Sequence, residues 1–144
     1  MTTTRLLSDL DLLRSRAFPA VPERSGHVDS GPGFHVAALA TSEEFWEDGS
    51  LREVVGEQYE AERDGLAAVL AARWGEPDRM SLWSLRDRCA AGERLPEPWS
   101  DLSAHVQDLM LWRVDARWIA LGVSQWGEEL PFQLLAVVTD VDPP

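Results

Sequence analysis

The 144-residue chain contains no lysine and no asparagine, and it has one cysteine and one isoleucine. All 13 basic residues are therefore arginine, against 25 acidic residues. A single cysteine excludes an intramolecular disulfide and a cysteine-based zinc site. Lysine, asparagine and isoleucine have AT-rich codons, so their scarcity predicts a bacterial source with a GC-rich genome. This is a coding bias and carries no physical information about the fold.

Long hydrophobic runs are also missing. The stretch 118–127 carries no charge, but its ten residues are about half of the roughly 20 that a membrane-spanning helix needs. Asp9 and Asp11 interrupt the apolar run near the N-terminus, so we do not expect a signal peptide. The sequence therefore predicts a cytoplasmic protein that does not enter the membrane.

Positive charge is scarce, and the negative charge is concentrated. The net charge of −12 argues against sequence-independent binding of nucleic acid and against anionic membrane surfaces. Residues 41–64 alone hold nine acidic residues and two arginines. This segment is the strongest signal in the composition, and it indicates a basic partner if it is functional.

Helical spacing of apolar residues predicts two main helices. Leu6, Leu10 and Leu13 place an amphipathic helix over 4–16. A long helix is expected to begin at Ser50, where Ser50 and Glu53 form a capping-box pattern, and to end before Gly75. We also expect a short helical turn within 41–49, a loop over 17–33 because of its prolines and glycines, and mixed structure over 86–106.

The segment 108–123 predicts a β-hairpin. With Asp115 and Ala116 in the turn, Trp112 faces Ile119 and the remaining apolar residues fall into register. Asp-Ala is not a favoured two-residue turn, which leaves a longer loop as an alternative. Further strands are expected over 34–40, 79–85 and 132–140.

These elements predict a single α+β domain spanning residues 1–144. We expect an antiparallel sheet of about four to five strands, with the long helix and the shorter N-terminal helix packed on one face.

Four acidic residues form a stripe on the long helix at spacings of three and four residues: Glu53, Glu57, Glu60 and Asp64. Close like charges destabilise an isolated helix, so the stripe is either a solvated face or a surface presented to a basic partner. Trp118 and Trp126 are expected either to anchor an interface or to form a second small core under a helix or loop.

Glu62 is predicted to interrupt the apolar stripe of the long helix. A carboxylate there would be paired with an arginine or would line a pocket as a binding or catalytic acid. His27, Asp29 and His35 offer metal-ligating groups, but their spacing matches no known metal motif, and solvated loop residues are the simpler interpretation. Ser124 in a GVSQWG stretch lacks the last glycine of a nucleophile elbow, so we interpret it as the end of a strand.

The function expected from the sequence is that of a non-enzymatic, acidic binding protein. It would mask or carry a basic partner protein, as an immunity-type inhibitor or a chaperone does, and it would need no metal or cofactor. The alternative is a small enzyme or ligand-binding domain with a pocket near Glu62.

Overall fold

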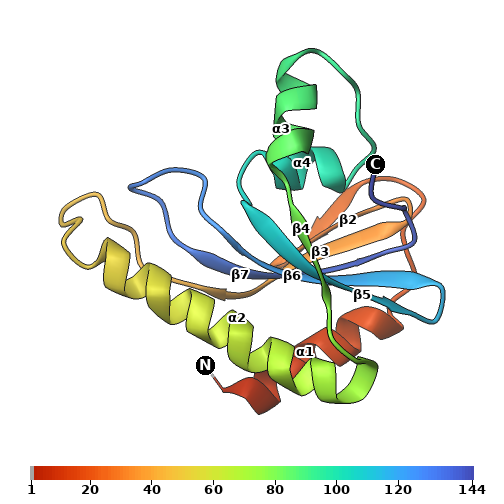
Figure 1. Cartoon of the computed structure of the whole chain (residues 1–144), viewed down its shortest axis with the longest axis horizontal. Helices are drawn as coiled ribbons and strands as arrows, with labels where there is room; N and C mark the ends of the chain where they lie inside the picture. The colour runs from red at the N-terminus through yellow and green to blue at the C-terminus, as the bar shows by residue number, and fades with distance from the viewer. Residues whose placement is uncertain (1) are drawn as a thin grey trace.

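One seven-stranded antiparallel sheet runs through the computed structural model, which describes residues 2–144 (Figure 1). The strands lie side by side in the order β1-β2-β3-β7-β6-β5-β4. Their bounds are β1 (Glu23–Ser25), β2 (Val28–Gly31), β3 (Phe34–Thr41), β4 (Asp78–Ser81), β5 (Asp108–Val114), β6 (Arg117–Ser124) and β7 (Gln133–Thr139). The α+β class and the antiparallel sheet are confirmed, but the expected four to five strands are too few.

Helices cover both faces of this sheet. The N-terminal helix α1 (Thr3–Ser15) and the long helix α2 (Arg52–Trp74) lie on one face, and α3 (Trp83–Ala90) and α4 (Trp99–Ser103) lie on the other (Figure 1). The two predicted helices do share one face, but helices α3 and α4 on the opposite face were not predicted. The central strands bury side chains of both orientations, so each face needs its own cover.

The alternation along the strands divides the buried side chains into two cores. The first core, under α1 and α2, contains Trp112, Ile119 and Leu121 together with leucines of both helices. The second core, under α3 and α4, contains Trp99 and Leu102 with the oppositely directed residues of β5, β6 and β7. Successive side chains of a strand point to opposite faces, so each of these three strands contributes to both cores.

The hairpin of β5 and β6 has the predicted register. Trp112 pairs with Ile119, and both belong to the first core. The turn contains only Asp115 and Ala116, whose φ angles are 52° and 63°. Positive φ at both central residues is the type I′ geometry, whose twist matches that of the strands it joins. The apolar register therefore outweighs the poor turn propensity of Asp-Ala.

The bounds of α2 agree with the prediction at one end only. The helix ends at Trp74, and Gly75 follows with a φ of 89°, a conformation that suits glycine. At the other end the predicted capping box does not form, because the N-cap residue is Leu51 and it makes no side-chain capping bond. The backbone N–H of Ser50 instead binds the carboxylate of Asp48.

The predicted loop over 17–33 contains two strands. Gly26 has a φ of 60° in the two-residue turn between β1 and β2, and Gly33 has a φ of 84° in the turn between β2 and β3. The glycines and prolines of this stretch therefore make tight hairpin turns rather than one long loop.

Two smaller predictions were also wrong. The expected helical turn within 41–49 is absent. This segment instead lies beside residues 129–132, and the Phe45 N–H donates a hydrogen bond to the Glu129 carbonyl. The strand expected over 79–85 stops at Ser81. The Ser81 hydroxyl then accepts a hydrogen bond from Trp83 N–H at the start of α3.

His35 in β3 fastens the end of α1 to the sheet. Its side chain is buried against the ring of Phe18, its Nδ1 lies 2.5 Å from the Ser30 hydroxyl, and its Nε2 lies 3.3 Å from the Arg16 carbonyl. A carbonyl oxygen can only accept a hydrogen bond, so the Nε2 atom that faces it carries the proton. The unprotonated Nδ1 then accepts a hydrogen bond from the Ser30 hydroxyl. Burial lowers the pKa of His35, because it disfavours the charged imidazolium. The hydrogen bond to the Arg16 carbonyl opposes this shift, whereas the positive charge of the Arg16 side chain adds to it.

We expect this burial to make the protein less stable in mild acid. Between the lowered pKa of folded His35 and its ordinary value of 6.5, the unfolded chain binds the proton more readily. The contribution of neutral His35 to stability is therefore fully present above pH 6.5, and it is lost as the pH falls from 6.5 toward the lowered pKa of the folded state. Urea unfolding of wild type and His35→Gln at several pH values measures the difference. His27→Gln, which removes an exposed histidine, is the control, and an equal slope in wild type and His35→Gln would contradict the assignment.

Candidate functional site

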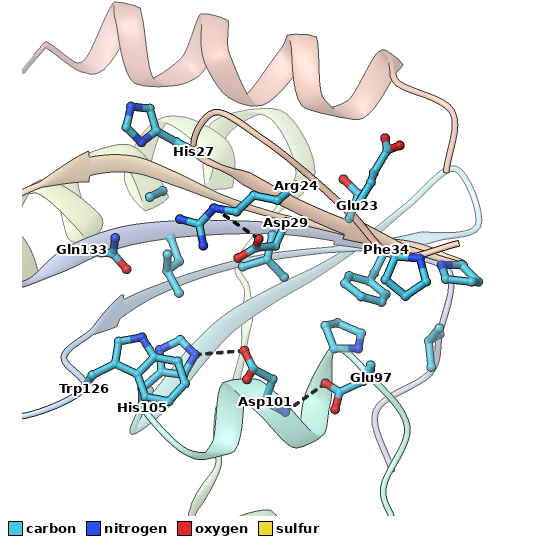
Figure 2. A pocket seen from close by; sticks show the side chains of 18 of the residues that line it. Glu23, Arg24, His27, Asp29, Phe34, Glu97, Asp101, His105, Trp126 and Gln133 are labelled. Carbon is cyan, nitrogen blue, oxygen red and sulfur yellow. Dashed lines mark hydrogen bonds and ion pairs between the residues drawn. The ribbon is translucent and has the colours of Figure 1, made fainter. Parts of the chain in front are cut away.

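A large hollow lies on the α4 side of the sheet, where α3 and α4 leave part of that face uncovered. We call it the sheet–α4 cleft; it has a volume of about 1080 Å³ and opens between strands β1–β3 and β7, helix α4 and the loop 125–131 (Figure 2). Phe34, Val36, Ala38 and Leu135 line its sheet side. This volume is at the upper end of the range for small-molecule pockets, about 300–1,000 Å³.

Charged side chains of both signs enter the cleft, and carboxylates predominate. Arg24 and Asp29 are paired across β1 and β2, with 3.7 Å between Arg24 Nε and Asp29 Oδ1. Glu97 and Asp101 approach from the α4 side, where a Glu97 oxygen accepts the backbone N–H of Asp101 at 3.0 Å (Figure 2). With Glu23 of β1, four carboxylates therefore share the cleft with one arginine, whose ion pair is largely exposed and weak.

His105 and Trp126 close one end of the cleft (Figure 2). The Trp126 ring stacks on the His105 ring with 3.9 Å between the centroids and 16° between the planes. The His105 side chain is 5% exposed, whereas Trp126 is 53% exposed. One face of the tryptophan ring thus covers the histidine, and much of the rest of the ring remains accessible.

The polar contacts of His105 resemble a catalytic triad only superficially. Nδ1 lies 2.5 Å from the Ser124 hydroxyl, and Nε2 lies 3.4 Å from a carboxylate oxygen of Asp101. In a serine hydrolase the two nitrogens have the opposite partners. Ser124 is the last residue of β6, as expected, and it is fully buried. The serine therefore holds the histidine in place and offers no accessible nucleophile.

A second hollow runs along α2, and we call it the α2 groove. It has a volume of about 930 Å³, and it lies between α2 and residues of β5, β6 and the loop 125–131. Glu53, Glu57 and Glu60 line it, so the structure brings three of the four predicted stripe residues to one hollow. Asp64 is also exposed, but it forms an ion pair with Arg63 at 3.1 Å.

The arginines of the α2 groove leave those three glutamates unneutralised. Arg63 pairs with Asp64 and Asp108, and Arg52 donates to the side-chain oxygen of Gln125 at 3.0 Å. Arg86 of α3 also lines the groove, and it forms no ion pair with any of the three glutamates. Within residues 2–144, the glutamates themselves form no ion pair. The groove therefore presents unpaired negative charge to the solvent.

The two predicted tryptophans lie at opposite ends of β6 and do not form one surface. Trp118 is half-buried against the second core, and its Nε1 donates to Asp142 at 3.0 Å. This agrees with the second-core alternative for Trp118. Trp126 is the exposed one, and it belongs to the sheet–α4 cleft.

Glu62 lies at the margin of the buried face of α2, half-buried and next to Tyr59. Burial raises the pKa of Tyr59, and the negative charge of Glu62 adds to this effect. Glu62 lines neither the sheet–α4 cleft nor the α2 groove, and it forms no ion pair in the described part of the chain. Leu51, which was expected to share the apolar stripe with Glu62, is 52% exposed, so the buried face of α2 is narrower than predicted.

Most residues of the sheet–α4 cleft gave no local signal in the sequence. Arg24, Glu97, Asp101 and His105 come from segments that only the order of the strands and helices brings together. The one usable signal was the alternation of side chains in β3. His35 and Ala37 face α1, whereas Phe34, Val36 and Ala38 face the opposite side of the sheet, where the cleft lies. Of the predicted metal-ligating residues, His27 and Asp29 line the cleft, whereas His35 is buried on the α1 side.

Among residues 2–144 no three histidine, cysteine, aspartate or glutamate side chains are grouped as a metal site would require. No helix of the described chain is long and apolar enough to span a membrane. In comparisons with known proteins, no family model, no curated protein and no solved structure matches this chain.

Proposed function

We propose that the protein binds a basic partner protein through the α2 groove. The observation that carries this proposal is the set of three exposed, unpaired glutamates that line the groove: Glu53, Glu57 and Glu60. We propose that the protein acts by masking or carrying its partner rather than by catalysis.

The placement of the glutamates supports a functional role, because it is unfavourable for the helix itself. Glu53 and Glu57 are four residues apart and Glu57 and Glu60 are three apart, so their charges are neighbours on α2. Each close like-charged pair costs an isolated helix roughly 0.2–0.5 kcal/mol. A basic partner would relieve this repulsion on binding.

The shape and charge of the groove also suit capture of a partner. A hollow lined by one predominant sign of charge concentrates the electric field and speeds the encounter with an oppositely charged molecule. With a net charge of −12, the whole chain attracts such a molecule from a distance. Nucleic-acid-cleaving toxins and other nucleic-acid-binding proteins are basic, so an immunity-type inhibitor or a chaperone for such a protein fits this chemistry.

The proposal predicts that charge reversal in the groove slows association. We expect Glu57→Arg/Glu60→Arg to bind an octa-arginine peptide more slowly than wild type, with a flatter dependence of the association rate on salt. Stability should be preserved or rise slightly, because positions 57 and 60 then attract Glu53 and Asp64, although they still repel each other. Stopped-flow association rates from low to high salt, with urea unfolding in parallel, measure both effects.

The matched control is Glu76→Arg/Asp87→Arg, which changes two exposed acids outside the groove and shifts the net charge equally. If both double variants slow association equally, only the overall charge matters, and the groove is not a binding surface. Unchanged kinetics of the groove variant at low salt would exclude the α2 groove altogether.

A further inference from the structure

We infer that the sheet–α4 cleft binds a small amphipathic amine, that is, an organic cation with an apolar body and a terminal ammonium group. The cleft lies on the α4 side of the sheet, whereas α2 packs on the opposite face. This inference therefore does not depend on the proposed function of the α2 groove. It concerns a free small molecule, because the hollow has the volume of a small-molecule pocket.

The sheet side of the cleft provides the apolar contact. Phe34, Val36 and Ala38 of β3 point away from the first core, and Leu135 of β7 lies beside them. Helix α4 covers only part of this face, so Phe34, Val36 and Ala38 are partly accessible in the cleft, whereas Leu135 is buried. An apolar ligand body would remove the accessible apolar surface from water, which favours binding.

The carboxylates determine the sign of the ligand charge. Asp29 enters the cleft from the sheet and Asp101 from α4, on opposite sides of the hollow (Figure 2). Both retain negative charge: the ion pair of Asp29 with Arg24 is long and exposed, and Asp101 faces a histidine that is charged only when it is protonated. An ammonium group between them could donate hydrogen bonds to either carboxylate.

The His105–Trp126 end adds an aromatic contact for a cation. The accessible part of the Trp126 ring can contact a cation through its π face. The Nε2 atom of His105 is buried and lies 3.4 Å from a carboxylate oxygen of Asp101. A ligand at this end would therefore contact the tryptophan ring and the Asp101 carboxylate rather than this nitrogen.

A set of three probes of similar size and shape tests the inference on the unmodified protein. We expect phenylbutylamine to shift the NMR signals of the Trp126 indole N–H and of the backbone of residues 34–38 in a saturable manner. Neutral phenylbutanol and anionic phenylbutyrate should bind at least about tenfold more weakly, since they lack the cationic group. Equal binding of the three probes would overturn the inference, as would shifts confined to the α2 groove.

Two variants separate the contributions of charge and aromatic contact. Asp29→Asn/Asp101→Asn should weaken phenylbutylamine binding at least about tenfold and leave phenylbutanol unchanged. Trp126→Ala should weaken the amine more than the alcohol. All three side chains are exposed, so we expect the variants to fold, which their amide spectra will verify.

The control is Glu57→Arg/Glu60→Arg, which alters the α2 groove and should bind the amine as wild type does. Undiminished amine binding by Asp29→Asn/Asp101→Asn would overturn the inference. The inference would also be overturned if the NMR signals of the cleft shifted with the octa-arginine peptide and not with phenylbutylamine, because the occupant would then be a peptide. Neither result bears on the α2 groove, so failure here is distinguishable from failure of the proposed function.

Discussion

Replacing Trp112 with alanine is expected to lower the free energy of unfolding by about 3–5 kcal/mol, the usual cost of deleting a large buried side chain. Trp112 is 3% exposed and packs edge-on against Trp74, with 6.1 Å between the ring centroids. Its Nε1 also donates to the carbonyl of Gly75 at 2.8 Å, which joins the end of α2 to the sheet. The variant therefore loses packing in the first core and the hydrogen bond that connects the end of α2 to the sheet. Urea unfolding at neutral pH measures the loss.

Two further variants show which part of the loss is packing. Trp112→Phe keeps an aromatic ring but removes the indole donor, so it should be more stable than the alanine variant and less stable than wild type. Trp83→Ala removes a tryptophan that is 68% exposed and should change stability by no more than about 0.5 kcal/mol. If Trp112→Ala were as mild as Trp83→Ala, the assignment of Trp112 to the core would be wrong.

Trp99→Ala should have a comparable effect on the opposite side of the sheet. Trp99 is fully buried at the start of α4, and its Nε1 donates to the carbonyl of Val141 at 3.1 Å. It is the largest side chain of the second core, so its loss should cost about 3–5 kcal/mol. Because α3 and α4 pack on the sheet through this core, we also expect faster hydrogen exchange in residues 83–103.

The exchange pattern distinguishes local from global destabilisation. In Trp99→Ala the amides of α3 and α4 should exchange faster relative to those of α1. In Trp112→Ala the larger increase in exchange rate should be in α1 and α2. Uniform exchange over the whole chain in both variants would mean that the two cores unfold as one unit. A cost for Trp99→Ala as small as that of Trp83→Ala would contradict its role in the second core.

The hairpin was predictable because its information is local. Residues 108–123 pair apolar residues on both sides of the turn, and a shift of one residue would move every side chain of a strand to the opposite face of the sheet. The α2 stripe was predictable for the same reason, since helical spacing alone places Glu53, Glu57 and Glu60 on one side.

The second core was one of two alternatives left open for Trp118 and Trp126, although the sequence contains a further signal for it. The apolar residues of 109–112 and 134–138 are nearly continuous and do not alternate with polar ones. A continuous run of this kind is typical of a strand buried on both faces. Both predicted helices were placed on one face of the sheet, and a helix or loop over the other face stayed an alternative.

The sheet–α4 cleft could not have been predicted from the sequence. Its walls come from residues near 24–29, 34–38, 97–105 and 126, and no spacing connects these segments. They meet because β7 lies between β3 and β6, which places the N-terminal hairpins and the loop after β6 on the same side. That strand order is a property of the whole fold, and no local motif encodes it.

The outer strands of the sheet have a consequence for the behaviour of the protein at high concentration. β1 has three residues and β4 has four, and every residue of β1 is exposed. Charged side chains occupy both strands, including Glu23 and Arg24 in one and Asp78 and Arg79 in the other. A neighbouring molecule therefore finds only a short, charged row of free amide and carbonyl groups to pair with, so intermolecular strand pairing, the first step toward fibrils, has little template.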